Sequence, residues 1–366
     1  MINRWSEEDA ARAVELYGPA WGEAVALRTY ASRLLGGEPG LVLHGGGNAS
    51  VKAARRTVTG GESAALFVKA SGFDMATIEP SGHPALDLGA LLRLQALDTL
   101  DDGAMVNEIR RALFDTRSPN PSIEALVHAF LPAAYIDHTH ADAILTLTNQ
   151  RDGLAIIQDA FRDSAVVIPY VEPGFLLAKA AAAGAASNRS ARALVLMKHG
   201  LITWGPTARE SYAIHLDLVT QAETFAAARA RRGATVTVST GDVAAAWERL
   251  DAIAPVLRGQ LARRTSDADP QWERVVLQPL VTDGVLALLE REGARDALVT
   301  PPLTTDHLIR TRSLPLWIDA PDWGDETRLR ARFGGAIEAY RASYREYVER
   351  HRAEMPEGLA EFDPTP

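Results

Sequence analysis

The 366-residue chain is 47% hydrophobic and 23% charged, an ordinary balance for a globular protein of one large domain or two domains. Its formal net charge of −9 argues against a nucleic-acid partner or an anionic membrane surface. Because the chain contains no cysteine, disulfides, thiolate zinc sites and cysteine nucleophiles are excluded. The polar N-terminus lacks a signal-peptide core, and no apolar run approaches the ~20 residues of a membrane span. We therefore expect a cytoplasmic protein.

Helices and strands are expected to alternate over the first 235 residues. Residues 6–36 have helical character, with Ser6 as the N-cap and Gly36-Gly37 as the stop. The same periodicity predicts helices at residues 86–100, 123–130 and 207–232. Short apolar runs predict strands at residues 41–44, 64–69, 144–148, 166–171, 193–197 and 201–204. This alternation indicates a layered α/β domain.

The character of the sequence changes beyond Thr240, where helices rich in arginine and acidic residues are expected. We therefore divide the chain into residues 1–240 and a mostly helical C-terminal extension, residues 241–366. The sequence shows no internal repeat, and its last residues, 361–366, contain no helix or cap.

His138 and His140 stand two residues apart at the end of an apolar run. On a strand, residues i and i+2 point the same way, with Cα atoms roughly 6.6 Å apart. Two such imidazoles can reach one cation at the usual Zn–N distance of about 2.0–2.1 Å. A surface strand that happens to carry two histidines is the alternative. A third candidate ligand is His199, which follows another apolar run and precedes a glycine.

Glu124 is the candidate acid. Asn120-Pro121-Ser122 is expected to begin a helix, which places Glu124 in the first turn near the positive end of the helix dipole. A glutamate at this position can instead be a capping-box residue that only satisfies backbone amides. One turn later, His128 is expected to be a core or supporting histidine and not a fourth ligand.

Glycine turns supply a candidate site for an anion. Gly45-Gly46-Gly47-Asn48 exposes backbone amides, and Ser71-Gly72 and Ser122 add amide and hydroxyl donors that suit an oxyanion or a phosphate. The chain lacks the Gly-x-Ser-x-Gly nucleophile elbow of lipases, a Walker loop and the Gly-x-Gly-x-x-Gly fingerprint. Nucleotide binding is therefore not expected.

Five motifs in order resemble the class II aldolase/adducin family. They lie between about residues 40 and 210 and read Gly-Gly-Asn-Ala-Ser (46–50), Lys-Ala-Ser-Gly (69–72), Pro-Ser-Ile-Glu (121–124), His-Thr-His-Ala-Asp (138–142) and Lys-His-Gly-Leu-Ile-Thr-Trp-Gly (198–205). The C-terminal region looks like the aldolase half of bifunctional rhamnulose-1-phosphate aldolase/short-chain alcohol dehydrogenases. Since the nucleotide-binding fingerprint is absent, no dehydrogenase activity is expected of this chain.

The resemblance implies a three-layer α/β/α fold assembled as a homotetramer. It implies a zinc ion, or another divalent transition metal, held by His138, His140 and His199, with Glu124 as acid/base. It further implies contacts to a sugar phosphate through Asn48, Ser71, Gly72 and Ser122, and Lys69 is interpreted as a further anion contact. The implied reaction is cleavage of a ketose 1-phosphate, such as L-rhamnulose 1-phosphate or L-fuculose 1-phosphate, to dihydroxyacetone phosphate and an aldehyde through a metal-stabilised enediolate.

Other functions stay open at this point. A sugar-phosphate 4-epimerase or a dehydratase would use the same metal and acid, and an adducin-like head would bind partners without catalysis. Ile123 stands where many aldolases carry a second hydroxyl residue, which weakens the expected phosphate cradle.

The extension contains a charged cluster, Asp306, His307, Arg310 and Arg312, shortly after a double proline. It is expected either to dock on the first domain and line the substrate entrance, or to be a solvated surface segment.

Overall fold

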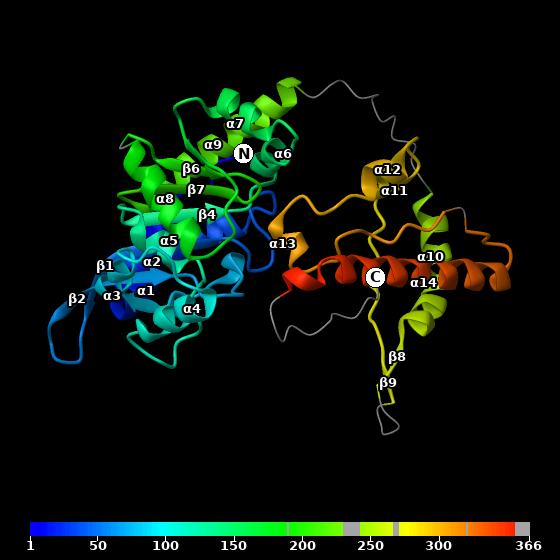
Figure 1. Cartoon of the computed structure of the whole chain (residues 1–366), viewed down its shortest axis with the longest axis horizontal. Coiled ribbons are helices and arrows are strands. Elements are labelled where there is room, and N and C mark those ends of the chain that lie inside the picture. Colours follow the sequence, from blue (N-terminus) through cyan, green and yellow to red (C-terminus); the bar gives the residue numbers. More distant parts are fainter. Residues whose placement is uncertain (189, 230–241, 266–270, 320, 356–366) are drawn as a thin grey trace. The chain divides into compact units, whose positions relative to one another are not determined.

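The computed structural model describes residues 1–188, 190–229, 242–265, 271–319 and 321–355 (Figure 1). The chain forms two compact units, and each is described by itself. The first comprises Met1–Arg231 and Leu303–Arg310, and the second comprises Arg232–Pro302 and Thr311–Pro366. The expected domain boundary at residue 240 and the C-terminal residues 361–366 lie outside the described residues. Within the described part of the chain, no helix is long and apolar enough to cross a membrane.

A seven-stranded mixed sheet forms the centre of the first unit, in the order β3-β2-β1-β4-β7-β6-β5. All neighbouring strands are antiparallel except β5 and β6, which are parallel. The strands are β1 (Asn48–Arg56), β2 (Glu62–Val68), β3 (Ala85–Asp87), β4 (Tyr135–Thr139), β5 (Val166–Ile168), β6 (Ala193–Leu196) and β7 (Gly200–Gly205). The central position of β4 is important below, because β4 carries His138.

Helices cover both faces of the sheet. One apolar cluster joins the sheet to α3 (Leu88–Leu94), α4 (Asp102–Arg111), α5 (Ala125–Phe130) and α8 (Phe175–Ser187). On the other face, apolar side chains join the sheet to α2 (Glu23–Gly36), α6 (Asp142–Thr148), α7 (Gly153–Phe161) and α9 (Ala208–Arg229), and α1 (Glu7–Trp21) packs on α2. Two single-turn 3₁₀ helices are η1 (Met75–Thr77) and η2 (Pro80–Gly82). The expected three-layer α/β/α fold is confirmed.

Several sequence-based boundaries are wrong for identifiable reasons. Residues 144–148 lie in helix α6, because a short buried apolar run looks the same in a strand and in a buried helix. Residues 41–44 form a turn that leads into β1. Strand β1 itself was not predicted, because its small and polar residues do not form an apolar run. The helix expected at 6–36 is two helices separated by Gly22, whose φ of 84° no helix permits. Residues 86–100 begin in strand β3 and continue as the short α3.

The second unit is mostly helical, as expected. It contains α10 (Val243–Leu261), α11 (Asp283–Leu289), α12 (Ala294–Leu298) and α14 (Glu326–Arg350), with the short strands β8 (Arg263–Arg264) and β9 (Trp272–Glu273) and the 3₁₀ helix η3 (Arg352–Glu354). A small apolar core joins α10 to α14 through Ile253, Val256, Leu329 and Phe333. The short helix α13 (Thr305–Leu308) belongs to the first unit.

Candidate metal centre and active site

Strand β4 delivers the first two histidines to one face of the sheet. All its residues are buried, and its side chains alternate, so Ile136 and His138 point toward the α5 side of the sheet. His140 follows directly after the last strand residue and is also buried. His138 lies opposite Asn48 of β1 in the antiparallel register. His138 and His140 therefore lie at the end of the apolar run, with their side chains on the same side of the sheet.

The opposite face of β4 is held by a buried polar network. The carboxylate of Asp137 lies 2.6 Å from the guanidinium of Arg28 on α2 and accepts a 2.5 Å hydrogen bond from Ser211 on α9. Thr139 is linked to His215 at 2.7 Å. Because these contacts fix the residues that alternate with His138 and His140, they fix the direction in which both imidazoles point.

His199 lies in the tight turn between β6 and β7. The turn bends at Lys198, whose φ is 60°, and continues at Gly200, where a β-carbon would overlap the carbonyl oxygen of Thr139. Only glycine allows β7 to approach β4 this closely. The sequence Lys-His-Gly thus places His199 beside the histidines of β4.

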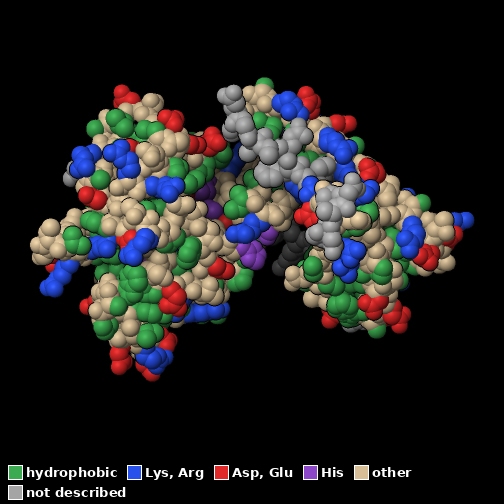
Figure 2. Space-filling view, turned by 90° about the horizontal axis from the view of Figure 1, so that it is seen from below, with side chains coloured by type: hydrophobic (Ala, Val, Ile, Leu, Met, Phe, Trp, Pro, Cys, Tyr) green, Lys and Arg blue, Asp and Glu red, His purple; other side chains and the backbone are tan. Residues whose placement is uncertain are grey.

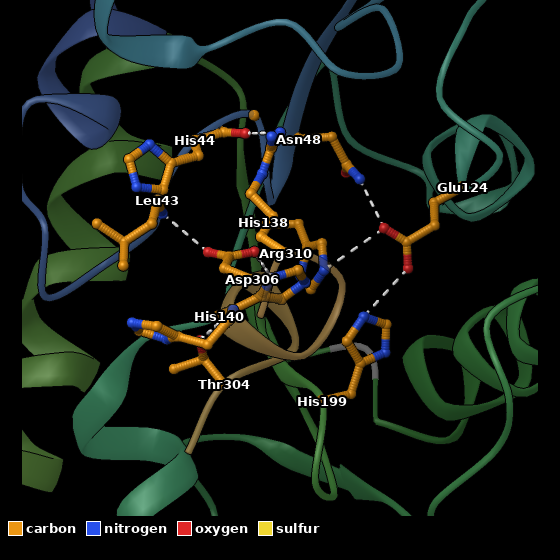
Figure 3. A network of polar contacts seen from close by, with 12 residues as sticks. Leu43, His44, Asn48, Glu124, His138, His140, His199, Thr304, Asp306 and Arg310 are labelled. Carbon is orange, nitrogen blue, oxygen red and sulfur yellow. Dashed lines mark hydrogen bonds and ion pairs between the residues drawn. The ribbon is translucent and has the colours of Figure 1, made fainter. Parts of the chain in front are cut away.

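The three imidazoles lie together, as expected (Figure 3). Their ring centroids are 4.9 to 5.2 Å apart, and one ring nitrogen from each lies within 4.8 Å of the others. His138 Nδ1 donates to the carbonyl oxygen of Leu201 at 3.0 Å, and His140 Nδ1 donates to Asp306 Oδ1 at 2.5 Å. These bonds place the lone pairs on Nε2 of both rings.

The buried histidine nitrogens fit a metal ion. Nε2 of His138 and of His140 is buried and has no hydrogen-bond partner among the described residues. Burial lowers the pKa of His138 and lowers that of His199 to about 4, so both rings are neutral and can act as ligands. Unpaired buried polar atoms are costly, and a cation among them removes that cost.

Glu124 faces the histidines and does not cap a helix. The helix α5 begins at Ala125, two residues later than the expected start at residue 123, so Glu124 stands at the N-cap position, and its side chain makes no capping hydrogen bond. Its Oε2 lies 3.5 Å from His138 Nε2 and its Oε1 lies 3.4 Å from His199 Nε2. Burial raises the pKa of Glu124, whereas positive charge among the imidazoles and the hydrogen bond from the Asn48 amide lower it. Since the rings themselves are neutral, a cation held among them would supply the charge that keeps this carboxylate ionised.

Asn48 orients this carboxylate. Its Nδ2 donates to Glu124 Oε2 at 2.6 Å and to Ser122 Oγ at 3.3 Å, and its Oδ1 accepts from His128 Nε2. His128 is fully buried and has a second contact, to Ser50 Oγ at 2.8 Å. His128 therefore supports Asn48 from behind, at a distance from the three-histidine cluster.

The other expected phosphate contacts lie close to one another. An isolated bridge between Ala70 and Pro121 brings Ser71 and Gly72 beside Ser122. Ser71 and Gly72 are exposed, and Ser122 is buried with its hydroxyl accepting from the Glu124 amide at 3.2 Å. The neighbouring Ile123 side chain is 47% exposed and provides no hydroxyl there.

Lys69 does not have the expected environment of an anion contact. Its buried ammonium donates to the carbonyl oxygens of Gly45 and Phe73, both at 2.8 Å, and of Ala70 at 3.4 Å. Three carbonyl acceptors use all three of its N–H donors. Lys69 therefore fixes the shape of the two glycine turns from behind.

Of the charged cluster in the extension, two members reach this site. Asp306 is buried against His140, and Arg310 donates to the carbonyl oxygen of His44 in the first glycine turn. His307 is partly buried and is linked to Thr304 at 2.8 Å. Arg312 belongs to the second unit, where its guanidinium lies 5.0 Å from the centre of the Tyr344 ring.

Comparison with known sequences and structures places this site in a family. The sequence profile of the Class II Aldolase and Adducin N-terminal domain matches residues 27–226. The chain belongs to the class II aldolase/adducin family. A second profile, that of the class II aldolase second domain, matches residues 248–366.

Individual proteins are similar to this chain over different lengths. The chain is 30% identical, over 348 residues, to an uncharacterized oxidoreductase of Bacillus subtilis, YuxG, covering 94% of this chain and 49% of the relative. It therefore spans about half the length of that curated relative. The N-terminal class II aldolase domain of a conserved protein from Thermoplasma acidophilum has a TM-score of 0.55 and 36% identity, and the match covers 62% of this chain and 99% of that one. An L-fuculose-1-phosphate aldolase structure from Thermus thermophilus has a TM-score of 0.37 and 19% identity, over 57% and 99% of the two chains.

Sequence reasoning missed the partners of the expected site residues. It assigned Asn48 only to the anion site, although Asn48 also holds Glu124, and it did not link Asp306 to His140. The Asn48 contact had no local signal, since it depends on the pairing of β1 with β4 beside His138. The Asp306 contact had none, because 166 residues separate it from His140.

Proposed function

We propose that this chain is a zinc-dependent aldolase that cleaves a ketose 1-phosphate, such as L-rhamnulose 1-phosphate or L-fuculose 1-phosphate, to dihydroxyacetone phosphate and an aldehyde. The observation that carries the proposal is the Glu124 carboxyl group within 3.5 Å of two imidazoles, in a cluster of three histidines with unpartnered nitrogens. A binding module has no need of this arrangement.

His138, His140 and His199 would hold the metal. Three neutral imidazoles suit zinc, and three protein ligands leave coordination positions open for a substrate, as in catalytic zinc sites. When bound there, the cation supplies Lewis-acid polarisation of the substrate carbonyl. Burial of all three side chains keeps water from competing for the site.

Glu124 would move the proton. In the cleavage direction, the C4 hydroxyl of the ketose loses its proton as the C3–C4 bond breaks, and C3 gains one proton to complete dihydroxyacetone phosphate. An ionised carboxylate can accept the first proton and deliver it to C3, so no co-reactant is required. The positive charge of a cation held by the three histidines would favour the ionised, accepting form of Glu124 at the start of the cycle. Asn48 keeps its carboxylate aimed at the histidine cluster.

The exposed Ser71 and Gly72, with Ser122 and Asn48, would hold the phosphate end of the substrate. Gly72 adjoins the first glycine turn, since a β-carbon on Gly45 would lie 2.8 Å from the Gly72 carbonyl oxygen. Two turns side by side form a cradle of small residues that suits a phosphate. On the face shown in Figure 2, basic and acidic side chains are interspersed, which is consistent with a small-molecule substrate and no nucleic acid. We expect a homotetramer in the cytoplasm.

A 4-epimerase or a dehydratase would use the same residues, so product analysis decides between the reactions. Zinc-loaded protein should release dihydroxyacetone phosphate from at least one member of a panel of ketose 1-phosphates, and a chelator should abolish this release. Epimerised or dehydrated sugar as the only product would overturn the aldolase proposal in favour of those reactions.

The Glu124→Gln variant tests the mechanism. It should lower kcat by roughly 10²–10⁴-fold while zinc stays bound at one equivalent, because the amide keeps the shape but can neither accept the proton nor deliver it. Full turnover by a folded, zinc-loaded variant would remove Glu124 from the mechanism.

A further inference from the structure

A short piece of the second family domain is part of the first compact unit. Residues Leu303–Arg310 fall within the region that matches the class II aldolase second domain, yet they pack with Met1–Arg231. The segment is attached at both of its ends. Asn149 Nδ2 donates to the Leu303 carbonyl oxygen at 2.9 Å, and Arg310 donates to the carbonyl oxygen of His44.

Asp306 is the buried centre of this segment (Figure 3). Its side chain is 1% exposed, and its two carboxylate oxygens have separate partners. Oδ1 accepts from His140 Nδ1 at 2.5 Å, and Oδ2 accepts from the backbone amide of Leu43 at 2.8 Å. The carboxylate thus ties the first glycine turn to the histidine cluster.

Gly46 leaves the space that this carboxylate fills. A β-carbon at position 46 would overlap the carboxyl group of Asp306. Gly46 is buried, and its φ is not in the left-handed region, so its backbone conformation does not require glycine. The absence of a side chain at position 46 therefore has a packing reason, which is room for Asp306.

The hydrogen bond from His140 has a direct chemical consequence. A carboxylate that accepts from Nδ1–H fixes the imidazole tautomer, fixes the ring plane and makes Nε2 more basic. In this structure Nε2 of His140 points toward His138 and His199 and has no partner among the described residues. The Nδ1 of His138 donates instead to a neutral acceptor, the backbone carbonyl oxygen of Leu201. Of these two histidines, His140 is therefore the one with a charged partner.

We propose that Asp306 is a positioning residue of the metal centre, so that the second family domain completes the metal site of the first. The inference rests on the proposed metal site. It goes beyond that site because it assigns part of the metal affinity to a residue outside the family's N-terminal domain. Carboxylate partners of histidine ligands typically change metal affinity by 10–100-fold.

The experiment measures zinc affinity in the full-length chain by competition with a chromophoric chelator. Asp306→Ala should weaken zinc binding by roughly 10–100-fold. Asp306→Asn keeps the size and one acceptor oxygen, which can still accept from His140, but it lacks the charge and the second acceptor, so its affinity should fall between wild type and Asp306→Ala. Asp98→Asn, which changes an exposed carboxylate of the same unit, is the matched control and should bind zinc like wild type.

Cobalt substitution separates positioning from general stability. Co²⁺ in the wild-type site has a visible absorption spectrum that depends on ligand geometry, and Asp306→Ala should change its band positions at saturating metal. A variant that was only less stable would keep the wild-type spectrum. Unchanged zinc affinity and an unchanged cobalt spectrum in both Asp306 variants would overturn the inference.

Gly46→Ala provides an independent test, because the added methyl group displaces the Asp306 carboxylate. It should weaken zinc binding as Asp306→Ala does, and the double variant should be no weaker than either single variant. Gly335→Ala, where the new β-carbon meets no atom within 4 Å, is the control. Additive losses in the double variant would show that the two residues act separately and would contradict the inference.

These results also distinguish the inference from the proposed function. Wild-type protein that binds zinc but cleaves no ketose 1-phosphate would refute the aldolase reaction and leave the role of Asp306 intact. Asp306 variants that bind zinc normally in an active aldolase would refute only the inference. Wild-type protein that binds no divalent metal would refute both.

Discussion

Replacing the buried Arg28 by methionine should strongly destabilise the first unit. The side chains of Arg28 and Asp137 are both 0% exposed, and their charged atoms lie 2.6 Å apart. Methionine has a similar length but no charge, so Asp137 would be left buried with only the Ser211 hydroxyl as a partner. Breaking a buried ion pair from one side costs about 3–5 kcal/mol of the free energy of unfolding. That is a large part of the roughly 5–15 kcal/mol of a typical domain.

The assay is urea or thermal unfolding of the full chain, with Arg209→Met as control. The Arg209–Glu7 pair has a separation of 2.8 Å, but its side chains are 66% and 69% exposed, so its loss should cost at most about 1 kcal/mol. At roughly 2–4 °C per kcal/mol for a unit of this size, Arg28→Met should lower Tm by about 6–20 °C.

The double variant Arg28→Met/Asp137→Asn tests the reasoning. It removes the isolated buried charge and keeps an acceptor for Ser211, so it should be more stable than Arg28→Met by at least about 1 kcal/mol. A loss in Arg28→Met no larger than in Arg209→Met would refute the argument. So would a double variant less stable than Arg28→Met.

Two further predictions concern the substrate. Asn48→Ala should raise KM for phosphorylated ketoses more than for unphosphorylated ones if Asn48 contacts the phosphate; an equal fall of kcat for both would assign it to holding Glu124 alone. Arg310, which lies at the first glycine turn, can grip a phosphate or carboxylate with its remaining donors, so Arg310→Ala should raise KM by roughly 10–100-fold. Arg310→Lys should restore part of that loss because it restores the charge but not the fork, and unchanged kinetics in a soluble Arg310→Ala protein would exclude Arg310 from the site.

The residues of the candidate metal site could be picked out from the sequence because their signals are local. His138 and His140 follow from the period of a strand, and His199 and Glu124 follow from the residues beside them. The structure brings all four side chains together. What local patterns cannot give is the partner of each residue across the sheet. Asn48 reaches Glu124 because β1 pairs with β4, and that pairing is a property of the whole sheet.

The wrong secondary-structure predictions also come from the limits of local sequence patterns. The apolar residues 144–148 are buried in helix α6, and the apolar residues 41–42 are buried beside a turn. In each case an apolar run is typical of a buried segment, but its secondary structure depends on what packs against it. Lys69 shows the converse, since a lysine among glycine turns suggested an anion, whereas its ammonium is used by three carbonyl oxygens.

The attachment of Leu303–Arg310 to the first unit has a consequence for how the protein is made. Ribosomes release the chain from its N-terminus, so the strands and helices up to Arg229 leave before the segment that contacts His140. During this interval the nascent first unit has its three histidines and Glu124 but lacks the carboxylate of Asp306, which holds His140. The proposed metal centre can therefore reach its full affinity only after residue 310 has been synthesised, which would tie metal acquisition to synthesis of the first half of the second family domain.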